Sequence, residues 1–221
     1  MTLNKTFRFA AIVATFLFIA SFWGANVAKA ECLAGYTERT IPMVINGCQY
    51  EVTLCVKCSI GPTPSDVVVQ PNEIRMISPV GCQTWNPNQV LNYVYSQVMT
   101  YDFIYSYLCP NPYITMSPCT DPEQNYKVTT NHWLCWRAYL TEYFGAFYTV
   151  IRPCNYYEKC VEEYYWCLNE QGQVERHTTR TYSVPSPITA ATCYGQSAID
   201  IEWPTAIGDT TDCWFADTPC N

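Results

Sequence analysis

Apolar and polar residues alternate on both sides of Asn46-Gly47, which predicts a β-hairpin. The alternating segments are Ile41 to Ile45 and Cys48 to Val56, and Asn-Gly between such segments is typical of a two-residue type I′ turn. This turn fixes the register of the two strands and gives the hairpin one apolar face. The pairs on that face are Ile45 with Cys48, Met43 with Tyr50, and Ile41 with Val52.

One helix is predicted near residues 87–105, where apolar residues recur at helical spacing. Asn86 is a favourable N-cap and Pro87 suits the first turn, so we expect the helix to begin there. We interpret its apolar stripe as a core contact rather than a binding groove. The stripe consists of Val90, Leu91, Val94, Val98 and Tyr101.

Further apolar and alternating runs predict short strands. Asn169 to Gly172 fits a type I turn with Gly172 in the left-handed region, which sets Glu162 opposite Arg180. The strand after this turn is polar on both faces, so we expect it to be exposed or at an edge. Residues 109–125 contain four prolines and are predicted as loop. The predicted strands are 67–69, 74–77, 126–140, 146–152, 160–168 and 173–184.

Residues 1–30 are predicted to be a cleaved secretory signal peptide. Lys5 and Arg8 form a basic start, Phe9 to Ala20 is apolar, and Ala28-Lys29-Ala30 supplies the small residues of a cleavage site. The apolar run is shorter than the roughly 20 residues of a membrane-spanning helix. We therefore expect a protein that is secreted or held at the cell surface and keeps no membrane span.

All 14 cysteines follow the predicted signal peptide, and an even number in an exported chain indicates a disulfide framework. Cys55-x-x-Cys58 has the spacing of a redox or metal motif, but Pro62 and Pro64 break the helix that a redox pair needs. A zinc site usually has a second such pair, so we predict structural disulfides. The cysteines are Cys32, Cys48, Cys55, Cys58, Cys82, Cys109, Cys119, Cys135, Cys154, Cys160, Cys167, Cys193, Cys213 and Cys220.

The predicted fold class is mainly β, with antiparallel hairpins or a meander, one helix and many disulfides. We expect residues 31–221 to form a single unit, although two similar halves meeting near 109–125 are an alternative. A split after Cys119 leaves seven cysteines on each side, so complete pairing within the chain needs at least one disulfide across the split. This argument favours one cross-linked unit.

The charge of the chain excludes some partners. Only 14% of the residues are charged, and the formal net charge is −7. Removing the predicted signal peptide leaves nine basic and 19 acidic residues, so the net charge becomes −10. We therefore predict no binding to nucleic acids, whose phosphates repel such a surface.

Few residues suggest catalytic chemistry. His132 and His177 are the two histidines, and the patterns of serine hydrolases, zinc proteases and phosphate-binding loops are missing from the sequence. We predict no metal and no cofactor. Glu162 or Glu163 could serve a glycoside hydrolase, but neighbouring residues of one strand face opposite sides. Solvated or ion-paired carboxylates are therefore the favoured interpretation.

Aromatic residues supply the candidate binding site, because tyrosine and tryptophan can stack on sugars or anchor protein interfaces. They also fill cores that are short of aliphatic residues, which is the favoured interpretation here. The candidate platform residues are Trp133, Trp136, Tyr164 and Trp166.

Three functions follow from these observations, in decreasing order of preference. The first is an exported structural or interaction protein, such as a surface or filament subunit, that associates with itself or with an extracellular protein. The second is a secreted glycan-binding module. The third is a carboxylate-dependent glycoside hydrolase, so an enzyme is the less favoured class.

Overall fold

A computed structural model describes residues 32–59, 66–78, 82, 85–110, 116–143, 145–156, 158–185 and 201–220. The predicted signal peptide lies outside these residues, and the chain from Cys32 onward forms one compact unit. The described part is mainly β, as predicted, with one α-helix, α2 (Pro87–Val98). The strands are β1 (Thr37–Ile45), β2 (Cys48–Lys57), β3 (Val67–Met76), β4 (Lys127–Trp133), β5 (Cys135–Tyr143), β6 (Ala146–Pro153), β7 (Lys159–Leu168), β8 (Val174–Val184) and β9 (Trp214–Phe215).

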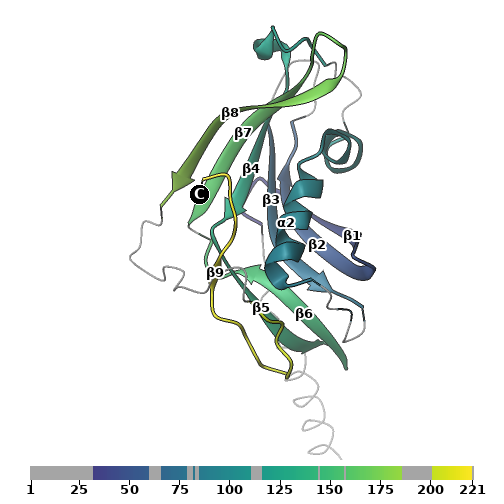
Figure 1. Ribbon diagram of the computed structural model, residues 1–221, viewed down its shortest axis with the longest axis vertical. Helices are drawn as coiled ribbons and strands as arrows, with labels where there is room; N and C mark the ends of the chain where they lie inside the picture. The colour runs from purple at the N-terminus through teal and green to yellow at the C-terminus, as the bar shows by residue number, and fades with distance from the viewer. Residues whose placement is uncertain are drawn as a thin grey trace, which may run out of the picture. The chain divides into compact units, whose positions relative to one another are not determined.

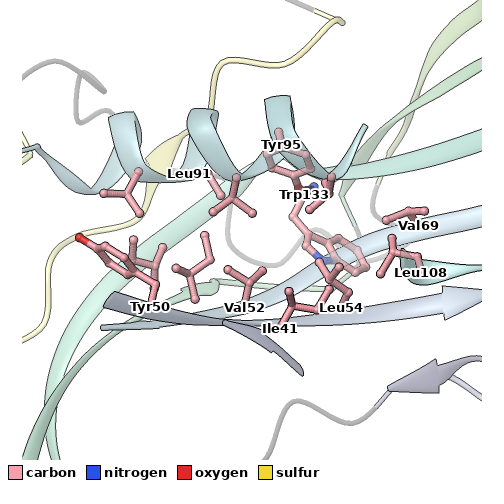
Figure 2. Close-up of a cluster of buried hydrophobic side chains, with 14 of the residues drawn as sticks. Ile41, Tyr50, Val52, Leu54, Val69, Leu91, Tyr95, Leu108 and Trp133 are labelled. Carbon is pink, nitrogen blue, oxygen red and sulfur yellow. Dashed lines mark hydrogen bonds between the residues drawn. The ribbon is translucent and has the colours of Figure 1, made fainter. Parts of the chain in front are cut away.

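The predicted hairpin is present as β1 and β2, and its register is confirmed. Ile45 pairs with Cys48, Met43 with Tyr50, and Ile41 with Val52. Asn46 and Gly47 both have positive φ, as a type I′ turn requires. The apolar face of the hairpin therefore packs into the core (Figure 2).

Strand β3 is the junction of the nine-stranded sheet. It pairs along one side with β2, while its other side pairs first with β4 in parallel and then with β6 in antiparallel orientation. The sequence predicts two short strands here, over 67–69 and 74–77. The structure has one strand instead. Pro71 pairs with Leu54 beside a register shift at which Asn72 is the extra residue of β3, and it lies between the segments that pair with β4 and β6.

The remaining strands extend the sheet from β4 and from β6, which share the second edge of β3. The order β8-β7-β4-β3-β6-β5-β9 is mostly antiparallel, with β2 and β1 branching from β3 (Figure 1). The prediction of one strand over 126–140 is wrong, because the chain breaks at Leu134 into β4 and β5. Strand β4 pairs with β3 directly, whereas β5 pairs with β6, which lies further along the same edge of β3. Periodicity alone does not show this break, because Leu134 between the two strands is itself apolar.

Helix α2 lies over β2 and β3 and covers the apolar face of the hairpin (Figures 1 and 2). Asn86 caps it as predicted: its Oδ1 accepts from Gln89 N at 2.9 Å, and Gln89 Oε1 accepts from Asn86 N at 3.0 Å. The helix ends at Val98, earlier than predicted, and a π-helix, η1 (Phe103–Leu108), follows. The fully buried residues of the stripe are Val90, Leu91, Val94 and Val98.

Six disulfides connect twelve of the cysteines, and Cys135 is disulfide-bonded as well. Cys55 and Cys58 do not bond to each other, because each bonds to a distant cysteine. The bridge between Cys119 and Cys167 connects the two sides of the split after Cys119. The six pairs are Cys32–Cys55, Cys48–Cys82, Cys58–Cys109, Cys119–Cys167, Cys154–Cys213 and Cys160–Cys220.

Candidate functional sites

Strands β4, β7 and β8 bring a buried polar cluster together around Glu162. The Glu162 carboxylate forms an ion pair with Arg176 and accepts a hydrogen bond from Thr178 Oγ1 at 3.1 Å. His132 Nε2 lies 3.6 Å from Glu162 Oε2, and both side chains are less than 10% exposed. The Arg176 guanidinium also lies 4.1 Å from the centroid of the Tyr164 ring.

The ion-pair partner of Glu162 differs from the prediction. The turn from Asn169 to Gly172 sets the expected register as far as the Tyr164–Thr178 pair, but a register shift follows. Glu163, rather than Glu162, then lies opposite Arg180, and Thr179 is the extra residue. Glu162 forms its ion pair with Arg176 instead, which lies opposite Trp166 in the ladder, as the turn predicts.

Glu162 and His132 respond to burial in different ways. Burial by itself raises the pKa of Glu162, but His132, the charge of Arg176 and the Thr178 hydrogen bond outweigh it, so the pKa is lowered. Burial lowers the pKa of His132, with Arg176 adding to the effect and Glu162 opposing it. At neutral pH the cluster therefore contains an ionised glutamate, an arginine and a neutral histidine.

We expect the oxidised protein to lose stability as the pH falls below the ordinary histidine value of 6.5. Because the folded-state pKa of His132 is lowered, the unfolded chain binds this proton more tightly, so the stability is complete above 6.5 and falls towards the folded-state pKa. Glu162 adds a further loss only below 4.5, its own ordinary value.

Urea midpoints measured between about pH 7 and about pH 5 test this expectation. His132→Gln should flatten the pH dependence in this range. His177→Gln is the matched control, since the other histidine is partly exposed on β8 and should leave the dependence in place. Equal curves for the wild type and His132→Gln would contradict the assignment.

The two candidate hydrolase carboxylates lie on opposite faces of β7. Glu163 forms an ion pair with Lys127 at 2.9 Å and accepts from Tyr182 Oη at 3.4 Å, whereas Glu162 belongs to the buried cluster. A glycosidase needs two carboxyl groups that flank one bond. The arrangement of Glu162 and Glu163 does not provide this, so both act as ion-paired residues.

The four predicted platform residues are mostly covered by the protein itself. Trp133, Trp136 and Tyr164 are at most 2% exposed and belong to the core, and Trp166 is partly buried against Tyr164. In Figure 2, the Trp133 side chain lies below α2 among the other core side chains. Stacking on a sugar needs a free ring face. The rings of Trp133, Trp136 and Tyr164 are covered by the protein and offer no such face to a sugar.

A second buried carboxylate, Glu73 of β3, is held by two arginines. Its Oε2 accepts from Arg152 Nε at 2.6 Å, and its Oε1 accepts from Arg75 Nη2 at 2.8 Å. The Arg152 guanidinium lies 5.6 Å from the Tyr139 ring centroid, and burial raises the pKa of Tyr139 to about 12. Glu73 is only 4% exposed, so the two arginines balance the charge of a carboxylate that is buried in the middle of the sheet.

Cys119, Cys167 and His177 have ligand atoms within 4.8 Å of one another. The two sulfur atoms are joined in a disulfide, so neither is a thiolate that could bind a metal. The proximity of His177 therefore reflects the pairing of β7 with β8.

Within the part of the chain that the structure describes, strand β8 presents a long free edge. Leu168 N donates to Ser117 O at 3.0 Å and Leu168 O accepts from Cys119 N at 2.9 Å, so the backbone groups of Leu168 point away from β8. Its partner Val174 is therefore in a non-hydrogen-bonded pair, and antiparallel alternation directs the backbone groups of Val174, Arg176 and Thr178 outward. Among the described strands, β8 pairs with β7 alone.

The sequence patterns missed one feature, a cavity at the start of α2. It has a volume of about 330 Å³ and is lined by Trp85, Gln89, Asn92, Tyr93 and Ser96. The spacing of these residues along a helix is a signal that could have found them. The prediction from the sequence considered only the apolar stripe on the opposite side of the helix.

Comparisons with protein-family models, curated proteins and solved structures find no match. The fold and the cross-links define the chain as a disulfide-rich β-sheet protein, and its bridges are typical of an oxidising, extracellular environment. Within the described residues, no helix combines the length and apolar character needed to cross a membrane.

Proposed function

We propose that this chain is an extracellular interaction protein that associates with a second copy of itself by strand addition along β8. The observation that carries the proposal is the free edge of β8, which has 11 residues, contains no proline, and has no buried residue. Such an edge exposes a row of backbone donors and acceptors that a further strand can satisfy.

The other long edge strand supports the choice of β8. Strand β1 pairs only with β2 among the described strands, and it carries Pro42 opposite Glu51. In the β1–β2 ladder, hydrogen-bonded and non-hydrogen-bonded residue pairs alternate from the Asn46-Gly47 turn. The Pro42–Glu51 pair is a non-hydrogen-bonded one, so the backbone nitrogen of Pro42 points away from β2, towards the edge of the sheet. A proline there removes a donor and blunts the edge, whereas the residues of β8 keep theirs.

The charges on β8 favour a second copy as the added strand. Glu175 and Arg180 pair with Cys167 and Glu163, two residues on the same face of β7, so both project from one face of β8. If two β8 strands run antiparallel about a twofold axis near Thr178, Glu175 of each copy lies near Arg180 of the other. The interface is then self-complementary, as a twofold contact requires.

Light scattering and electron microscopy of the oxidised protein test this proposal. We expect dimers or larger regular assemblies for the wild type. Arg180→Glu should weaken association at least about tenfold, because like charges then face each other across the strands. The double variant Glu175→Arg/Arg180→Glu restores the complementary pairs and should restore association.

Val44→Lys is the control. Val44 is an exposed residue of β1, the edge strand that carries Pro42, so the added charge should leave the assembly unchanged. A wild type that remains monomeric at high concentration would overturn the proposal. So would an assembly that responds to Val44→Lys but not to Arg180→Glu.

A further inference from the structure

The cavity at the start of α2 combines flat rings with polar side chains. Trp85 and Tyr93 are partly buried, and their ring centroids lie 5.7 Å apart at an interplanar angle of 67°. Two rings in this edge-to-face arrangement form a corner and leave ring surface on the side of the cavity. A volume of about 330 Å³ is at the small end for ligand pockets and suits one ring of a ligand.

Contacts from the C-terminal part of the chain hold the backbone and the helix that carry the two rings. Trp203 Nε1 donates to Trp85 O at 2.6 Å, which fixes the backbone just before the helix. Asp217 Oδ2 accepts from Asn88 Nδ2 at 3.2 Å and from Asn92 Nδ2 at 3.1 Å. The site is thus formed before any ligand arrives, and this lowers the entropic cost of binding.

The polar side chains of the cavity are each bound to the protein at one end. The Nδ2 of Asn92 is bound to Asp217, so its Oδ1 remains as an acceptor. The Oε1 of Gln89 accepts from Asn86 N, so its Nε2 remains as a donor. Ser96 Oγ donates to Tyr93 O at 2.7 Å and keeps its lone pairs as acceptors. These groups form a fixed set of donors and acceptors beside the two rings.

We propose that this cavity binds a neutral pyranose unit of a glycan. A pyranose has an apolar face of C–H groups that stacks on an aromatic ring, and hydroxyl groups that both donate and accept hydrogen bonds. The five lining residues carry no charge, and Asp217 nearby is already shared by two amides. An anionic sugar would have no cation to meet here and would approach a chain of net charge −7.

The test uses neutral oligosaccharides of glucose, mannose, galactose and N-acetylglucosamine, with a uronic acid oligosaccharide for comparison. Tryptophan fluorescence titrations should show saturable binding of at least one neutral probe and weaker binding of the acidic one. Trp85→Ala and Tyr93→Ala should each weaken binding at least about tenfold, the loss of a stacking platform. Phe147→Ala removes an exposed ring outside the cavity and is the matched control.

NMR of the wild-type protein keeps the proposal testable if the alanine variants fail to fold. The indole N–H signal of Trp85, assigned with Trp85→Phe, should shift on titration while that of the buried Trp214 stays in place. The proposal is overturned if none of the neutral probes binds, if the acidic probe binds better, or if Phe147→Ala weakens binding as much as Trp85→Ala. These outcomes are separate from those at β8, because the cavity and the edge share no residue.

Discussion

Trp136→Ala is expected to lower the free energy of unfolding by about 4 kcal/mol, the usual cost of deleting a large aromatic side chain from a core. Trp136 is fully buried, and its Nε1 donates to Trp133 O at 2.8 Å. Its ring meets that of Tyr95 edge-on, with centroids 6.4 Å apart. Alanine would leave a cavity where β5 meets the core and an unsatisfied carbonyl group at Trp133.

Urea unfolding of the oxidised protein, followed by circular dichroism, measures this loss. Phe147→Ala is the matched control, because Phe147 is 48% exposed and its removal should change the stability by less than about 0.5 kcal/mol. If Trp136→Ala cost no more than this control, Trp136 would not be a core residue.

Arg152→Met is expected to destabilise the protein by about 3 kcal/mol. The substitution removes the closest cation from the buried Glu73 carboxylate and leaves Arg75 alone, which is itself partly exposed. Breaking a buried ion pair is costly because one charge is left without its partner. The double variant Glu73→Leu/Arg152→Met removes both charges and should recover most of the loss, since an apolar pair of similar volume has no such penalty.

Arg137→Met provides the control for this prediction. Arg137 lies directly opposite Arg152 in the β5–β6 ladder but is exposed. Because it faces a like charge, its removal should be neutral or slightly stabilising. Equilibrium urea denaturation compares all four proteins, and similar losses for Arg137→Met and Arg152→Met would show that the Glu73 group has no special role.

The elements set by local signals could be predicted from the sequence. The β1–β2 register follows from Asn46-Gly47, and the start of α2 follows from Asn86 and Pro87, because a few neighbouring residues determine each geometry. The free edge of β8 follows from its polar residues on both faces. These signals involve residues that are adjacent in the chain.

The features that depend on distant contacts could not be predicted. The continuity of β3 through Pro71 depends on the extra residue Asn72 in its pairing with β2 and on the positions of β4 and β6. The same limit applies to Glu162, whose partner changes with a single extra residue in β8. The cavity at Trp85 also needs Trp203 and Asp217 from the far end of the chain to shape it.

The position of β3 at the junction of the sheet has a consequence for the order of folding. One edge of β3 pairs with β2, which immediately precedes it in the sequence. The other edge pairs with β4 and β6, around Val128 and Thr149, which come much later in the chain. Contacts that close long loops form slowly. During synthesis and export, therefore, β1, β2 and β3 can assemble under α2 as an early nucleus with an open edge. The C-terminal half then completes that edge, so a chain stopped before β4 would emerge as an aggregation-prone fragment.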